Sequence, residues 1–145
     1  MKNVLIILFF IIGFSQVSFG QEIGVRFGNT VGGDVAIDGV FAFKKSRIHA
    51  DVSFRKGGVG VVGVYDFIVS PLGDEAFNWY LGVGASAFLG NPFELGIPGE
   101  IGLEYRFDNV PIALGLDWRP TFILIETTDF KIDRFGLNVR FVLAK

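Results

Sequence analysis

Residue types that could carry chemistry are scarce in this chain, and its one histidine is the first candidate. His49 shares one face of a period-two segment with Asp51 and Ser53, and these are the residue types of a nucleophilic hydrolase. A strand rises about 3.3 Å per residue, so His49 and Ser53 lie about 13 Å apart, too far for direct proton transfer. We therefore expect His49 to make a hydrogen bond inside the fold, and we expect no catalytic residue.

Cofactor and metal chemistry has little support either. The chain has no cysteine, one histidine and one methionine, which excludes thiolate chemistry and leaves little for a metal centre. Gly57-Gly58 and Gly82-Val-Gly84 are not phosphate loops, because no helix and no P-loop lysine accompanies them. Asp38, Asp51 and Asp66 lie in separate segments and do not form a calcium loop. The sequence predicts a protein that is not an enzyme and holds no metal or cofactor.

Charged residues within the alternating segments are the best candidates for a functional group of residues. They are arginines and carboxylates nearly balanced in sign, whereas the lysines fall in turns or at segment ends. A planar guanidinium suits confined pairing with carboxylates, and a buried charge without a partner is costly. The predicted interior network comprises Arg26, Asp38, Asp51, Arg55, Glu100, Glu104, Arg106, Asp117, Arg119 and Arg140, with Asp66 on the same parity. It could form an ion or proton path or a salt-bridged plug, and a narrow interior favours the plug.

The elements that must position these charges are β-strands. Apolar residues alternate with small or charged ones between turn residues, as they do over residues 102–107. The predicted strands span residues 22–28, 35–43, 48–55, 59–67, 78–88, 100–107, 111–122 and 131–143, with loops over 90–99 and 126–129. In the fourth strand, Val62 and Val64 fall on the face that otherwise carries small or charged residues. Eight strands and no helix after residue 20 predict an all-β, eight-stranded antiparallel up-and-down barrel.

The two faces of these strands differ in volume, and this difference decides which face points outward. One face carries both tryptophans and many phenylalanines, which are too bulky to fill an eight-stranded barrel, whereas the other is rich in glycine. The aromatic residues also gather at the strand ends, as in the girdles of membrane barrels. One end would hold Phe41, Phe43, Tyr65, Phe67, Trp79, Tyr105, Phe107 and Phe141, and the other Phe27, Phe54, Trp118 and Phe122. The sequence thus predicts a transmembrane barrel that is apolar outside and charged inside.

The first 20 residues have the organisation of a secretory signal peptide. Lys2 provides the positive n-region, residues 4–14 the apolar h-region, and Ser18-Phe19-Gly20 the small residues before a cleavage site. A membrane anchor helix is the alternative, but the apolar run is shorter than the roughly 20 residues that a spanning helix needs. We expect cleavage of residues 1–20 and a mature outer-membrane barrel domain over residues 21–145.

The last predicted strand carries a second export feature. Residues 134–141 resemble the C-terminal signal by which assembly machinery recognises outer-membrane barrels, with Gly136, Val139 and Phe141 at its glycine and apolar positions. The chain departs from that signal by continuing to Lys145 instead of ending at the aromatic residue. The resemblance implies that the barrel-assembly machinery is a partner during biogenesis.

Two further segments extend the resemblance. Residues 102–107 and 111–120 are similar to the penultimate hairpin of small eight-stranded outer-membrane β-barrel proteins, the OmpA/OmpX-like architecture. The likeness covers the mature chain in architecture and its last third in motif. It implies an outer-membrane location with membrane lipids and lipopolysaccharide as neighbours, and it transfers no catalytic residue to this chain.

These features predict a small integral outer-membrane protein, monomeric, with a structural or surface-interaction role and a closed interior. The net charge of −2 gives no reason to expect a nucleic-acid partner. Two alternatives remain open. A lipid-modifying outer-membrane enzyme would cluster His49 with a serine and a carboxylate at a lipid-accessible wall. A soluble periplasmic lipocalin-like barrel would enclose an apolar, empty interior that binds a ligand.

Overall fold

The period-two segments form long β-strands in the computed structural model of the chain. It describes residues 2–8, 21–31, 33–43, 46–55, 57–73, 77–91, 93–125 and 128–144. Its strands are β1 (Gln21–Gly28), β2 (Val35–Phe43), β3 (Ser46–Arg55), β4 (Gly58–Pro71), β5 (Phe77–Gly90), β6 (Glu94–Arg106), β7 (Ile112–Trp118), β8 (Thr121–Ile123), β9 (Asp129–Lys131) and β10 (Phe135–Ala144). Residues 2–8 are helical, and the predicted cleavage site lies outside the described residues. Across the described ranges, no helix combines the length and apolar character needed to cross a bilayer.

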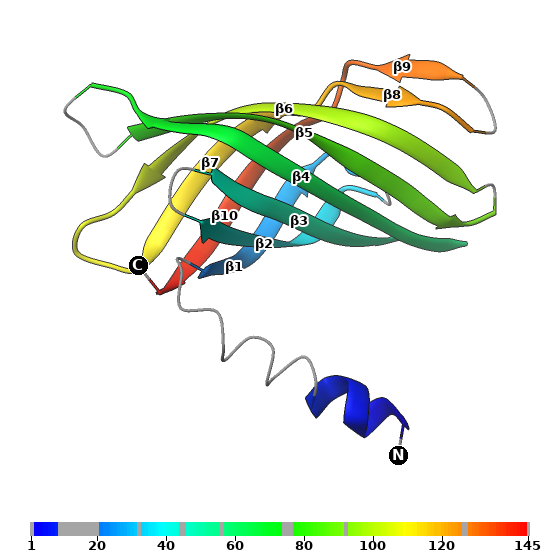
Figure 1. Cartoon of the computed structure of the whole chain (residues 1–145), viewed down its shortest axis with the longest axis horizontal. Helices are drawn as coiled ribbons and strands as arrows, with labels where there is room; N and C mark the ends of the chain where they lie inside the picture. The colour runs from blue at the N-terminus through cyan, green and yellow to red at the C-terminus, as the bar shows by residue number, and fades with distance from the viewer. Residues whose placement is uncertain are drawn as a thin grey trace.

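The strands close into an antiparallel barrel (Figure 1). Each strand from β1 to β6 pairs with the strand that follows it, β7 pairs with β10, and β10 returns to β1. The predicted all-β, eight-stranded antiparallel barrel is therefore confirmed, with β1 to β7 and β10 forming the wall. The short strands β8 and β9 pair with each other, and β8 also extends the ladder of β6.

The single strand predicted over residues 111–122 is wrong, because it is divided into β7 and β8. Arg119 and Pro120 lie between these two strands, and proline has no N–H to donate to a ladder. The N–H of Arg119 donates instead to Arg134 O, and the N–H of Gly99 donates to Pro120 O, both at 2.8 Å. These bonds hold Arg119 at the barrel wall although it belongs to no strand.

The loop predicted over residues 90–99 is also wrong, because β6 extends through much of it and includes Pro98. The ladder between β5 and β6 omits Pro98, which faces Thr121 of β8 on its other side. Proline is tolerated in a strand where its neighbour requires no N–H from it. The strand predicted over residues 131–143 is divided as well, because residues 132–134, between β9 and β10 in the chain, belong to no strand.

Side chains on the two faces of the wall are sorted by polarity as the sequence predicts. Phe54 is 63% exposed on the outer face, whereas Arg140 on the inner face has no exposed surface. Val62 and Val64 lie on the inner face, as their parity predicts, in a small apolar cluster that includes Phe88. The barrel thus encloses its charges and presents most of its large apolar side chains outward, with Tyr80 and Phe88 as buried exceptions.

Aromatic side chains pack together near both ends of the wall. Phe77 and Phe107 each contact Tyr105, with ring centroids 4.9 Å apart in both pairs. Trp118 stacks on Phe135 with a centroid distance of 6.0 Å. Tyr105 lies near the end of β6 and Trp118 at the end of β7, so the two groups occupy opposite ends of these antiparallel strands. The side chain of Phe43, predicted to belong to the first group, lies outside the described part of the structure.

Candidate functional site

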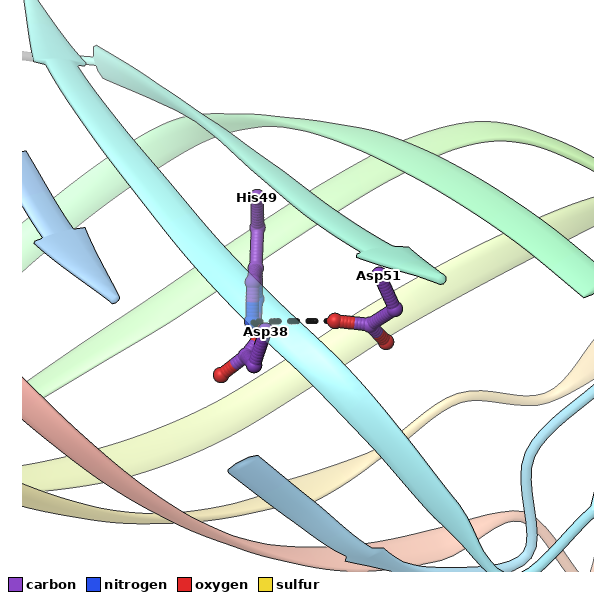
Figure 2. Close-up of side chains that lie close together, drawn as sticks. All are labelled: Asp38, His49 and Asp51. Atoms are coloured by element: carbon purple, nitrogen blue, oxygen red, sulfur yellow. Dashed lines mark hydrogen bonds and ion pairs between the residues drawn. The ribbon is translucent and has the colours of Figure 1, made fainter. Parts of the chain in front are cut away.

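The centre of the barrel is built around the His49 ring, which has no exposed surface. Its Nε2 lies 2.5 Å from Asp38 Oδ1 on the neighbouring strand β2, and its Nδ1 lies 2.9 Å from Glu100 Oε1 on β6 across the barrel. In Figure 2, Asp38 lies at the tip of the ring, and Asp51 lies to one side, where its Oδ1 is 3.8 Å from Nε2. Ionised carboxylates only accept hydrogen bonds, so this geometry suits an imidazolium that donates from both ring nitrogens. The expected interior hydrogen bond of His49 is therefore present twice.

Arg119 adds a second cation to this group. Its Nε donates to Glu100 Oε1 at 2.8 Å, and its Nη1 pairs with Asp51 Oδ2. Its Nη2 lies 3.1 Å from His49 Nδ1. The backbone bonds at the break between β7 and β8 position this guanidinium. Two cations therefore share the carboxylates of Asp38, Asp51 and Glu100.

Arg140 of β10 carries the same pairing towards the other end of the barrel. Its Nε donates to Glu22 Oε1 at 3.2 Å, its Nη1 to Asp38 Oδ2 at 3.1 Å, and its Nη2 to Glu104 Oε2 at 2.9 Å. The three carboxylates belong to β1, β2 and β6. Because Asp38 also contacts His49, one continuous set of ion pairs connects both groups.

Arg47 of β3 completes the set. Its Nη1 donates to Glu104 Oε2 at 2.9 Å and its Nε donates to Asp66 Oδ2 at 3.0 Å. Its guanidinium also lies 4.2 Å above the Tyr80 ring, a cation–π contact. We call the connected residues that are buried the central network: Glu22, Asp38, Arg47, His49, Asp51, Asp66, Glu100, Glu104, Arg119 and Arg140.

A separate pair lies beside the central network. Arg26 Nη2 contacts Asp117 Oδ1 at 2.6 Å, and Asn138 Nδ2 donates to Asp117 Oδ2 at 2.8 Å. Arg26 Nη1 also donates to Asn29 O at 3.0 Å. Gly136 is required here, because a Cβ at that position would overlap the Arg26 guanidinium. The glycine of the C-terminal motif thus packs against an interior ion pair.

The structure brings together most of the interior network that the sequence predicts. Buried and ion-paired are Arg26, Asp38, Asp51, Glu100, Glu104, Asp117, Arg119 and Arg140. Arg106 pairs with Glu22 and Glu104, but 35% of its side chain is exposed. Arg55 does not join the network: it is exposed, and its guanidinium lies 3.9 Å from the centre of the Phe88 ring. Arg55 is the last residue of β3, so its side chain lies beyond the end of the charged interior.

Sequence reasoning missed some network members. Glu22 shares the parity of Arg26, and Arg47 shares the parity of His49, so the alternation contained a signal for both. The third predicted strand begins at residue 48, so the predicted interior network does not include Arg47. Of the predicted C-terminal motif, Val139 and Phe141 point outward, 37% and 56% exposed.

Two residue groups have the donor types of a metal site. The ligand atoms of Asp38, His49 and Asp51 lie within 4.8 Å of one another, as do those of His49, Asp66 and Glu100. A metal at either place would have to displace a ring proton of His49. It would also place a dication beside a guanidinium that already lies about 3 Å from the ring. The arrangement is better suited to ion pairing than to metal binding.

The same geometry bears on catalysis and conduction. The ring nitrogens of His49 face carboxylates and a guanidinium inside the barrel, and the ring is buried from the outer wall. Beside the network, at Asp51 and Arg119, a small cavity of about 10 Å³ is just large enough for one water molecule. The interior therefore resembles a packed ionic core more than a channel or a substrate site.

Comparison with known proteins finds no matching family model, no matching curated protein and no matching solved structure.

Proposed function

We propose that residues 21–145 form a small integral outer-membrane protein with a structural or surface-interaction role, in which the wall faces lipid and the interior is a closed ionic plug. The observation that carries this proposal is the inverted polarity of the barrel. Exposed apolar patches of more than a few hundred Å² are rare on soluble monomers. Here large apolar side chains are exposed on all the wall strands, whereas the interior holds arginines and carboxylates.

The shape of the wall supports contact with lipid tails. A groove of about 630 Å³ runs over the outer face between Trp79 of β5 and Phe135 of β10, with Leu103 and Leu116 between them. Flexible acyl chains can fill the grooves of such an uneven apolar surface. A closed barrel also satisfies its backbone hydrogen bonds within the wall, which hydrocarbon surroundings require.

The pairing of the interior supports a closed barrel over a porin-like conductor. Arg140 of β10 contacts Glu104 of β6, two strands away along the wall, and Arg119, which follows β7, contacts Asp51 of β3. Buried pairs of this kind are costly to break, because separation leaves an uncompensated charge. An ion crossing the barrel would have to break several of them, so we infer no conductance.

Sequence features in the first 20 residues and in the last strand support the proposal of export. The first wall strand begins at Gln21, the first residue after the predicted signal peptide, so the proposed cleavage keeps all of β1. The C-terminal motif lies on β10, which closes the barrel against β1. We therefore infer passage through the barrel-assembly machinery into a membrane that contains lipopolysaccharide.

Fractionation of a Gram-negative host that expresses the full chain tests this function. We expect a protein that begins at Gln21, is found in the outer-membrane fraction and migrates faster on gels before heating than after. Deletion of residues 2–20 is the matched control and should leave the protein inside the cell. Recovery from the soluble periplasmic fraction would instead favour the ligand-binding barrel.

Two further readouts distinguish the remaining roles. In planar bilayers the purified barrel should give no steady conductance. In the host, the mass spectrum of the membrane lipids should not change when the protein is expressed, whereas a lipid-modifying enzyme would change it.

A further inference from the structure

A cavity of about 190 Å³ lies at the end of the barrel where the segment after β1 meets β3, β6 and β9. We call it the mouth cavity, and its polar lining includes Asn29, Thr30, Arg55, Glu94, Asp133 and Arg134. Its volume corresponds to roughly six water molecules at their volume in the liquid. It therefore has room for a small polar group.

Arg134 is the unusual residue of the mouth cavity. The residue is only 8% exposed, and its Nη1 is buried without a hydrogen-bond partner among the described residues. Within the described part of the chain its side chain also makes no ion pair within 4 Å, unlike Arg140 and Arg119. It lines both the mouth cavity and the small neighbouring cavity at Asp51 and Arg119. Burial of this guanidinium costs desolvation energy, and no described ion pair compensates that cost.

The residues that line the mouth cavity include three cations, Arg55, Lys131 and Arg134, and two carboxylates, Glu94 and Asp133. Asp133 accepts a hydrogen bond from Asn29 at 3.2 Å, and Lys131, which also lines the cavity, is paired with Asp129. Burial, together with nearby Arg26 and Arg55, lowers the pKa of Arg134, although Glu94 and Asp133 oppose this effect. Glu94 and Asp133 therefore both belong to the lining, but no described ion pair within 4 Å joins either carboxylate to Arg134 or Arg55.

We propose that the mouth cavity binds a phosphate group, with Arg134 donating hydrogen bonds from its floor and Arg55 from its side. A planar guanidinium fork matches the oxygens of phosphate, and such charge-assisted bonds are among the strongest that proteins make. The group could arrive as free phosphate or as part of a lipid headgroup. The proposal goes beyond the proposed function, because binding of free phosphate requires only the folded barrel.

Thermal unfolding of the mature barrel in a neutral detergent tests the proposal. Inorganic phosphate should raise the unfolding midpoint of the wild type above that in chloride of equal ionic strength, since a ligand that binds only the folded state stabilises it. Arg134→Gln should lower the phosphate affinity by about tenfold or more, as expected for loss of charge-assisted hydrogen bonds. Arg55→Gln, at an exposed position, should weaken binding to a smaller extent.

A control variant and two lipid compositions complete the design. Arg106→Gln changes a half-exposed arginine at the opposite end of β6 that already has two partners, and it should keep the response to phosphate. Stabilisation in nanodiscs that contain phosphatidate, without a response to inorganic phosphate, would assign the site to a headgroup. A wild-type midpoint that responds to neither source, or an Arg134→Gln variant that responds as the wild type does, would overturn the proposal.

Discussion

The central network and the mouth cavity both contain arginines, but only the first neutralises them. Arg140 contacts three carboxylates and has no exposed surface. Arg134 is nearly as buried, yet no described residue forms an ion pair with it. The difference indicates two uses of the same side chain. A guanidinium surrounded by its own carboxylates stabilises a closed barrel, whereas one without them is ready for an external anion.

Loss of a shared carboxylate in the central network should have the largest effect. Glu104→Ala removes a partner from Arg47 and Arg140 and leaves both guanidinium groups buried. We expect the free energy of unfolding to fall by about 3–5 kcal/mol, the cost of breaking a buried pair from one side. Urea titration, followed by the gel shift between folded and unfolded barrel, measures this change. A midpoint equal to that of the wild type would show that the pairing contributes little.

A methyl group added at Gly136, beside the pair of Arg26 and Asp117, should have the next largest effect on stability. Gly136→Ala places a Cβ against the Arg26 guanidinium, which is fixed by Asp117. Overpacking of this kind costs about 1–3 kcal/mol. Gly63→Ala is the matched control on a wall strand, because a Cβ there meets no atom within 4 Å. Equal unfolding midpoints for the two variants would contradict the close contact.

The wall was predictable from the sequence, because strand parity is a local property. The partners within the interior were not, since they depend on how strands far apart in the chain are staggered. Arg26 and Asp117 are 91 residues apart, and Arg140 and Glu22 are 118 apart. The alternation along each strand predicts that these residues face the interior, but it does not predict which of them form ion pairs with one another. Arg55 has the right parity too, but its height along β3 places it beyond the network.

Removal of the exposed arginine at the mouth should have a small effect on stability. Arg55→Gln, in buffer without phosphate, loses the contact between its guanidinium and the Phe88 ring. Cation–π contacts at exposed sites contribute about 0.5–1 kcal/mol, so we expect a loss of that size. Differential scanning calorimetry of the two proteins in the same detergent measures it. A loss as large as that of Glu104→Ala would place Arg55 among the structural charges.

Replacement of the unpartnered arginine should cost least of all, and it is the most direct test of the comparison. Arg134→Met keeps most of the apolar stem of the side chain but removes a buried charge that no described carboxylate compensates within 4 Å. Leaving a buried polar group unsatisfied costs about 1–3 kcal/mol, so in phosphate-free buffer this variant should unfold no earlier than the wild type. Addition of phosphate should then reverse the order, because only the wild type gains a ligand. If Arg134→Met instead unfolds as early as Glu104→Ala in phosphate-free buffer, Arg134 is a structural charge like those of the central network, and the distinction between the two regions fails.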